Sequence, residues 1–192
     1  QVEPLGDSIY DAIQSGEIND VRIKKKDEVL VAKLRALGVS NEEIRQYRDI
    51  YKGNVFIDKT KGEVHMLEVI ELILDAFEQV VDAGPLAKEP CMKMKVSLVD
   101  VKLHEDAIHR GPAQVYPAMR DALYGAMRDG KASLFEPIQV HLIEAPNEYL
   151  SAVTSLVAGK RGQLLDVRQD EAGVTVKAKL PVQEMIGWSN DL

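Results

Sequence analysis

The longest amphipathic segment of the chain, residues 61–83, constrains the fold more than any other feature. Its apolar side chains recur at helical spacing, at Leu67, Ile70, Ile73, Leu74, Phe77, Val80 and Val81. A helix with so broad an apolar face packs that face against a core. Thr60 and Glu63 form a box-like capping pair at its start, and Gly84-Pro85 ends it. The segment therefore predicts a long helix packed into a folded domain.

Three shorter helices are predicted before it. The first lies within residues 7–18 and stops at Gly16, and the second lies within residues 19–38 and stops at Gly38. The third, residues 40–51, opens with the capping box Ser40-x-x-Glu43, in which hydroxyl and carboxylate each satisfy a backbone amide. The segment "GNVFID" that follows is predicted to be a short strand.

A strand is predicted over residues 91–104, "CMKMKVSLVDVKLH". Apolar residues alternate strictly up to Leu98, and then the alternation slips by one position to Val99, Val101 and Leu103. A slip of one residue moves side chains to the other face of a sheet, so we expect a bulge near Leu98 or a strand buried on both sides. This strand leads directly into His104.

Residues 104–114 are predicted to be a loop in which titratable groups are unusually dense. The helix after it, residues 115–130, contains Pro117, which we place in the first turn because proline is unfavourable in a helix interior. The loop has four interpretations. They are a metal-dependent hydrolase site formed by His104, Asp106 and His109, a histidine acid–base site, a solvated polar loop, and an RNA contact.

The RNA interpretation fits the composition of the loop better than the enzyme interpretations do. Arginine offers a planar fork to phosphate, and glutamine and histidine can bond sugar hydroxyls or base edges. Gly111 would allow a close approach of the backbone. The composition of the loop points to His104, His109, Arg110, Gly111 and Gln114 as RNA-contacting residues, and the family resemblance described below adds Asp106.

A second unit begins near Phe135. It contains a strand at 136–146, a helix at 147–162 and a hairpin that turns at residues 171–173. Strand, helix, strand, strand is most of a ferredoxin-like unit, and we expect its closing helix and strand to follow Leu192. Lys160 and Arg161 are interpreted as basic residues at a helix end, with a phosphate contact as the alternative. The run Lys24-Lys25-Lys26 is interpreted as an exposed face at a helix start.

Composition excludes several classes of protein. The 192 residues are 45% hydrophobic, enough for a core, and the net charge of −7 disfavours nucleic-acid binding by the whole surface. The single cysteine, Cys91, cannot form an internal disulfide, which fits a reducing compartment. No 18-residue apolar run and no signal peptide are present, and a first residue other than methionine suggests a piece of a longer chain.

The loop and its flanks resemble archaeal and eukaryotic elongation factor 2, the translocation GTPase. The resemblance is carried by "DVKLHEDAIHRGPAQVYPAMRDALY" and continues through "NVFIDKTKG", "GPLAKEP", "FEPIQVHLIEAP" and "GKRGQLLDVR". It implies an α+β protein. Residues 1–134 would be the fourth, tip domain, a two-layer α/β unit with a left-handed βαβ crossover. Residues 135–192 would be the truncated, ferredoxin-like fifth domain.

The resemblance also implies a function and a set of partners. His109 would be the histidine that becomes diphthamide, and the 104–114 loop would contact the codon–anticodon helix in the decoding region. Partners would be the ribosome with its tRNA–mRNA duplex, the diphthamide-synthesis enzymes and ADP-ribosylating toxins, in the cytoplasm and without a membrane. GTP and Mg²⁺ would bind a nucleotide-binding domain outside this chain, which itself holds no cofactor, catalytic residue or metal ligand. Gly111-Pro112-Ala113 resembles the archaeal form, since eukaryotic members have three glycines here.

Overall fold

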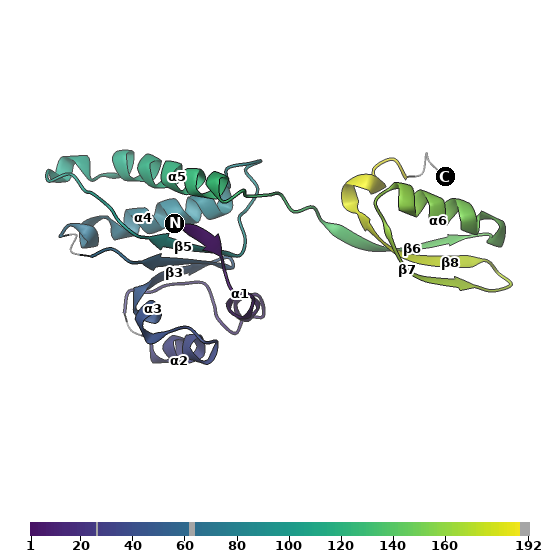
Figure 1. Cartoon of the computed structure of the whole chain (residues 1–192), viewed down its shortest axis with the longest axis horizontal. Helices are drawn as coiled ribbons and strands as arrows, with labels where there is room; N and C mark the ends of the chain where they lie inside the picture. The colour runs from purple at the N-terminus through teal and green to yellow at the C-terminus, as the bar shows by residue number, and fades with distance from the viewer. Residues whose placement is uncertain (26, 62–63, 189–192) are drawn as a thin grey trace. The chain divides into compact units, whose positions relative to one another are not determined.

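The structure, a computed structural model, describes residues 1–25, 27–61 and 64–188. The chain divides into two compact units, Gln1–Ser133 and Leu134–Leu192 (Figure 1). Each unit has its own sheet and its own hydrophobic core. Among the described residues, no helix combines the length and the apolar character needed to cross a membrane.

The first unit is built on a five-stranded mixed sheet. In spatial order its strands are β1 (Val2–Pro4), β5 (Met94–Leu98), β4 (Asn54–Asp58), β3 (Tyr47–Tyr51) and β2 (Val21–Arg22). Strands β4 and β5 are parallel and the other neighbours are antiparallel. Helix α4 (Met66–Asp82) lies between β4 and β5 in the chain, as a βαβ crossover requires. The left-handed sense of this crossover stays a prediction.

Helices cover both faces of this sheet (Figure 1). Helix α4 and helix α5 (Pro112–Asp129) pack on one face, where Phe77 meets Phe56 with ring centroids 5.4 Å apart. Helices α1 (Asp7–Gln14), α2 (Glu28–Ala36) and α3 (Asn41–Gln46) pack on the other. The alternation along β4 explains both contacts, because Phe56 points to one face and its neighbours Val55 and Ile57 to the opposite one. The predicted α/β class is confirmed, with helices on both faces where two layers were expected.

The predicted long helix is confirmed as α4. Ile73, Leu74, Phe77, Val80 and Val81 are buried, whereas Leu67, expected on the same apolar face, is 90% exposed. The helix begins at Met66, later than expected. The predicted capping pair cannot be assessed, because residue 63 lies outside the described residues.

The prediction of one helix over residues 40–51 is wrong in its second half. The Ser40 hydroxyl accepts a hydrogen bond from the Glu43 amide at 3.1 Å, as one half of the capping box predicts, and the Glu43 carboxylate accepts from Lys95 Nζ at 3.4 Å. Helix α3 ends at Gln46. Strand β3 follows and pairs with β4 through a two-residue turn at Lys52 and Gly53, with φ of 45° and 75°. Positive φ at both positions is the hairpin geometry that glycine favours, so the "YKGN" sequence was a usable signal.

The predicted bulge near Leu98 is absent from the β4–β5 ladder, which keeps one register to its end at Leu98. Val96 and Ser97 are both buried, which favours the alternative of a strand covered on both sides. Residues 99–103 then leave the sheet without strand pairing. Val101 and Leu103 pack against the core under α4 and α5, which explains the shifted apolar pattern.

Helix α5 begins earlier than predicted. Gly111 is its N-cap residue and Pro112 occupies the first turn, where proline's missing amide costs nothing. The Gly111 carbonyl accepts hydrogen bonds from the amides of Gln114 and Val115, which fixes the helix start. Placing Pro117 in the first turn was therefore wrong, since Pro117 lies inside the helix. Of the predicted 104–114 loop, residues 112–114 belong to α5.

The second unit is a three-stranded antiparallel sheet covered by one helix. Strand β6 (Ile138–Ala145) leads through Asn147–Tyr149 into α6 (Leu150–Gly159), and β7 (Gln163–Gln169) and β8 (Val174–Pro181) form the predicted hairpin. The order β6-β8-β7 is that of a ferredoxin-like βαββ unit, so this part of the predicted fold class is confirmed. The alternating residues of β8 are buried, as predicted: Val174, Val176, Ala178 and Leu180.

Candidate functional site

The segment between β5 and α5 is a tightly folded loop rather than an irregular one. Its residues Ala107–His109 form a single 3₁₀ turn. The Asp106 carboxylate caps this turn by accepting the Ile108 amide at 3.0 Å, and the Asp106 amide donates to Nδ1 of His104 at 3.0 Å. Both bonds are local, so the backbone shape of the loop is encoded within the loop itself.

The two histidines of the loop lie together on the surface. Their rings make an edge-to-face contact with centroids 4.5 Å apart. Both side chains are exposed, and the described residues offer the His109 ring no hydrogen-bond partner. His109 is therefore held in place by the backbone turn and by one aromatic contact, and it stays exposed to solvent.

Arg110 does not share this exposure. It is only 8% exposed, and its Nη1 donates to the carbonyls of His104 and Glu105, both at 2.7 Å. Its Nη2 donates to the Glu68 carboxylate on α4 at 2.6 Å. The expectation that Arg110 contacts RNA is corrected, because its guanidinium is turned inward and fastens the loop to helix α4. Sequence reasoning missed this because the partner lies 42 positions away.

The Glu68 carboxylate has a second partner, since His65 Nδ1 lies 2.9 Å from its other oxygen. The hydrogen bonds from His65 and then from Arg110 lower the pKa of Glu68 below its ordinary value, against a weaker opposing effect of burial. The contact between Arg110 and Glu68, which we call the clamp, is thus an ion pair that fastens the loop to the first turn of α4.

Gly111 and Gln114 occupy the start of α5. Gly111 has φ −82° and ψ 175°, which any residue adopts, and a side-chain carbon there would meet only Gln114 Oε1, at 3.5 Å. The fold itself therefore does not require glycine at this position. Gln114 is exposed beside it, which leaves its amide available to a partner.

The hydrolase interpretation needs His104, Asp106 and His109 to converge on a metal ion. Within the described ranges, no three His, Cys, Asp or Glu side chains are grouped in that way. His104 Nδ1 and one Asp106 oxygen are already occupied by backbone amides. No observation in this loop favours the hydrolase over the RNA contact.

Apolar side chains are exposed at the same end of the first unit. Leu67 is 90% exposed, Val64 83% and Ile108 74%. Leu67 is adjacent in sequence to Glu68, which holds the loop through Arg110, so both segments belong to one end of the domain. Exposed large apolar residues gathered at one place mark an interaction site. The helical pattern alone could not distinguish Leu67 from the buried members of its stripe.

In the second unit, Lys160 and Arg161 end helix α6. Gly162 donates its amide to the Val157 carbonyl at 2.9 Å, and Arg161 has φ 55°, the geometry of a Schellman cap. The Arg161 guanidinium bonds both oxygens of Glu136 and one of Glu184. The helix-end interpretation therefore accounts for Arg161, whose charge is already balanced within the unit.

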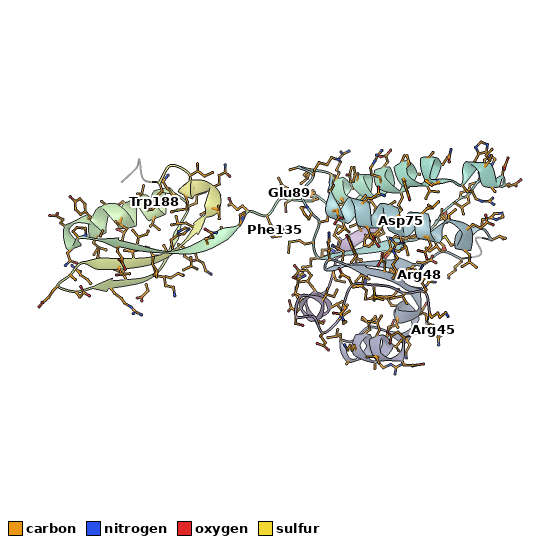
Figure 2. The ribbon with its side chains drawn as sticks, turned by 180° about the vertical axis from the view of Figure 1, so that it is seen from behind. Arg45, Arg48, Asp75, Glu89, Phe135 and Trp188 are labelled. Atoms are coloured by element: carbon orange, nitrogen blue, oxygen red, sulfur yellow. The ribbon has the colours of Figure 1, made fainter. Side chains whose placement is uncertain are left out.

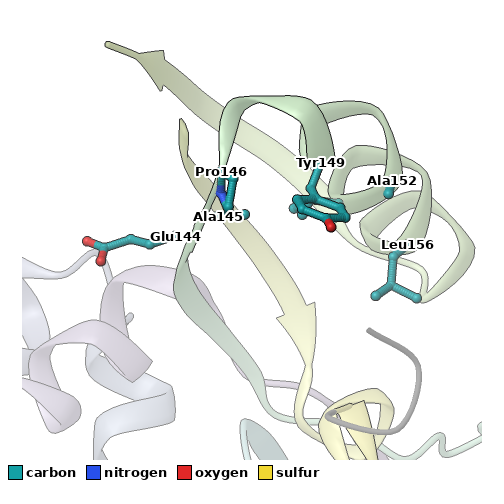
Figure 3. A pocket seen from close by; sticks show the side chains of 7 residues that line it. Glu144, Ala145, Pro146, Tyr149, Ala152 and Leu156 are labelled. Carbon is teal, nitrogen blue, oxygen red and sulfur yellow. The ribbon is translucent and has the colours of Figure 1, made fainter. Parts of the chain in front are cut away.

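A pocket of about 270 Å³ opens in the second unit beside β6 and α6 (Figure 3). Its lining is mainly apolar and includes Pro146, Tyr149 and Leu156, and Glu144 is its only ionisable carboxylate. It contains none of the residues singled out in the sequence. We therefore place the candidate functional site at the 104–114 loop.

Removing the clamp should loosen the loop without unfolding the domain. We expect Arg110→Ala to lower the free energy of unfolding by about 1–3 kcal/mol, because two carbonyls lose their charged donor. Hydrogen–deuterium exchange should show faster exchange of the amides of Asp106, Ile108 and Arg110. Glu68→Gln is the matched control, since it keeps an acceptor and should have a smaller effect. Unchanged exchange in Arg110→Ala would contradict the clamp.

Comparison with known proteins gives two family matches. Residues 18–131 match the model described as elongation factor G, domain IV, and residues 133–192 match elongation factor G C-terminus. Elongation factor 2 of Nanoarchaeum equitans is 44% identical over 100% of this chain, and that of Pyrococcus abyssi is 47% identical over 98%. Elongation factor 2 of Methanosphaera stadtmanae is 41% identical over 100% of this chain. The chain spans 26% of the length of each of these relatives.

Proposed function

Because the chain belongs to the elongation factor 2 family, we propose that it is part of a translation elongation factor that moves tRNA and mRNA through the ribosome. Both family models and relatives that share 41–47% of its residues support this proposal. We assign residues 1–134 to the tip domain and residues 135–192 to the domain that follows it. The bound GTP and Mg²⁺ would belong to a nucleotide-binding domain outside this chain.

Within this function, the 104–114 loop is the part that reaches the codon–anticodon helix, with His109 as the acceptor of the diphthamide modification. The observation that carries this assignment is the exposed His109 ring on a loop that its own hydrogen bonds and the Arg110 clamp hold in shape. A group that must be modified by an enzyme and then touch RNA has to be accessible. A group that must hold a fixed position against RNA has to sit on a rigid part of the protein.

The chemistry of paired RNA fits this end of the molecule. An A-form helix exposes its 2′-hydroxyls and base edges in a wide, shallow minor groove. The nitrogens of His109 and the amide of Gln114 can bond such hydroxyls, while Leu67 and Ile108 offer apolar contact to ribose. Asp106 shapes the backbone through the Ile108 amide and does not orient the imidazole. The loop would then hold the duplex while the ribosome releases it.

His109→Ala in the full-length factor tests this assignment. We expect the free energy of unfolding to change by less than about 0.5 kcal/mol, because the side chain is exposed. We expect intact mass to show that the diphthamide-synthesis enzymes add nothing to the variant, and ADP-ribosylating toxins to leave it unmodified. Single-round translocation on cytoplasmic ribosomes should be slower than with the modified wild type.

Ile108→Ala is the matched control, since it removes a neighbouring exposed side chain and leaves the acceptor histidine. It should still be modified. A His109→Ala variant that gains the same mass as the wild type would refute the assignment. So would a large loss of stability, because that would mean the ring is packed.

A further inference from the structure

The topology of the first unit gathers basic residues at one edge of its sheet. Strands β2, β4 and β5 run in the same direction, because β3 is antiparallel to β2 and β4, and β5 is parallel to β4. Their carboxyl ends therefore meet at one edge, and lysines follow each of them. The antiparallel β3 begins at this edge and brings Arg45. We call these residues the basic edge: Lys24, Lys25, Arg45, Lys59, Lys61 and Lys102.

Figure 2 shows the position of this edge, with Arg45 and Arg48 at one end of the sheet and Glu89 at the other. The 104–111 loop belongs to the same edge as Arg45, because it follows the carboxyl end of β5. The basic edge and His109 therefore share one end of the first unit, although they come from four separate stretches of sequence.

The charges of the basic edge are largely unbalanced within the protein. Lys25, Arg45, Lys61 and Lys102 are exposed, and none of them has an ion-pair partner among residues 1–25, 27–61 and 64–188. Lys24 pairs with Glu71. The remaining neighbour, Arg48, pairs with Asp58 and is not counted in the edge.

Most carboxylates at this end are engaged by other groups. Glu68 binds Arg110 and His65, and Glu71 is shared with Arg22. Asp106 and Asp27 accept backbone amides at the starts of their helical turns. Glu105 is exposed and remains as an opposing charge. The basic edge is therefore a local cationic surface on a chain whose net charge is −7.

Lysines at the opposite edge of the sheet are placed differently. Lys52 pairs with Asp82 at 2.7 Å, Lys93 pairs with Asp7, and Lys88 donates to the Tyr124 hydroxyl at 3.1 Å. Those lysines stabilise contacts inside the unit. Arg128 and Lys131, at the end of α5, are exposed, so the basic edge is distinguished by the number of cations that its strand ends bring together.

We propose that the basic edge binds the phosphate backbone of an RNA strand alongside the 104–114 loop. The proposal rests on the proposed function. It assigns the binding of phosphate to the cations of the basic edge, because Arg110, the cation of the loop, is turned inward. Lysine ammonium groups act as point charges toward phosphate and carry no sequence information. The basic edge thus positions the duplex, and the loop contacts its groove.

Salt dependence of RNA binding tests the proposal directly. The edge variant is Lys25→Gln, Lys61→Gln and Lys102→Gln in this chain, and the probe is a short fluorescent RNA duplex followed by anisotropy. Each lost phosphate contact removes roughly 0.9 from the slope of log K against log salt, so the slope should fall by about 2 to 3. Affinity at low salt should fall accordingly.

The matched control is Lys52→Gln, Lys88→Gln and Lys131→Gln. It removes the same number of positive charges from the opposite end of the unit. All three lysines have positive φ, and glutamine keeps a long polar side chain at each position. We expect this control to retain the wild-type slope. Circular dichroism should show that both variants remain folded.

Several outcomes would overturn the proposal. These are a wild-type chain that binds no duplex, an edge variant with the wild-type slope, or a control that loses as much as the edge variant. Competition by poly-glutamate as effective as by RNA would assign the surface to an acidic protein instead. If His109→Ala weakens binding and the edge variant does not, the loop assignment stands and the basic edge is refuted.

Discussion

Leu74→Ala will lower the free energy of unfolding of the first unit by about 2–5 kcal/mol. Leu74 is 3% exposed and packs in the core between α4, α5 and the sheet. Removing a buried isobutyl group loses its transfer free energy and leaves a cavity that the surroundings fill only in part. Phe77→Ala, at a fully buried position against Phe56, should cost about 3–5 kcal/mol for the same reason.

The same helix supplies a matched control. Leu67→Ala makes an identical chemical change at a position that is 90% exposed, so its effect should stay within about 0.5 kcal/mol. Urea unfolding followed by far-ultraviolet circular dichroism measures both units, and the transition that Leu74→Ala shifts is that of the first unit. Trp188, the only tryptophan, lies in the second unit and should keep its own transition. Equal losses from Leu67→Ala and Leu74→Ala would contradict the assignment of the core.

The second large effect concerns a carboxyl group buried in the first unit. Asp49 is 1% exposed, and its Oδ2 lacks a hydrogen-bond partner among the described residues and lies 3.8 Å from Arg22 Nε. Arg22 is meanwhile bonded to Glu71, Asp75 and Glu78. Burial, and then the nearby Glu78, raise the pKa of Asp49 to about 7. Asp49 is therefore neutral over a pH range in which an unfolded aspartate is charged.

The direction of the pH effect follows from the proton balance. Between about pH 4 and pH 7 the folded state holds more protons than the unfolded state, so this group makes stability fall as pH rises through that range. The contribution of Asp49 to the free energy of unfolding is complete below about pH 4 and is lost above about pH 7. At about 1.4 kcal/mol per pKa unit, the total is at most about 4 kcal/mol.

Asp49→Asn removes this titration and keeps the shape of the side chain. Relative to wild type, we expect the variant to gain about 2–4 kcal/mol of unfolding free energy between pH 4.5 and pH 8. Urea unfolding at several pH values measures the difference. Asp121→Asn, at an exposed aspartate on α5, should leave the pH profile parallel to wild type. A parallel profile for Asp49→Asn would show that Asp49 titrates normally.

The sequence was sufficient for features that depend on local pattern. The 3.6-residue period of α4, the strict alternation in β8 and the Ser40 cap were each predicted and confirmed. These features succeed because helix and strand periods place side chains on defined faces whatever the rest of the fold does. The resemblance added the loop, which pattern alone left open between a solvated loop, an enzyme site and an RNA contact.

What the sequence could not supply depends on partners distant in the chain. Arg110 was expected to contact RNA, and only the position of Glu68 on a different element turns it inward. Strand β3 was taken for helix because α3 and β3 follow each other without a break, and pairing with β4 decides where one ends. The basic edge is likewise invisible in sequence, because its lysines are scattered from residue 24 to residue 102 of an acidic chain.

The salt link from Glu68 to Arg110 also bears on how any modifying enzyme would find its target. A synthetic peptide of residues 103–114 contains the histidine but not the glutamate that holds the turn closed. An enzyme that recognised the peptide alone would have to pay the entropy of ordering it. The folded domain offers the same imidazole already oriented, so substrate recognition would be conformational, and misfolded or nascent copies of the chain would be passed over.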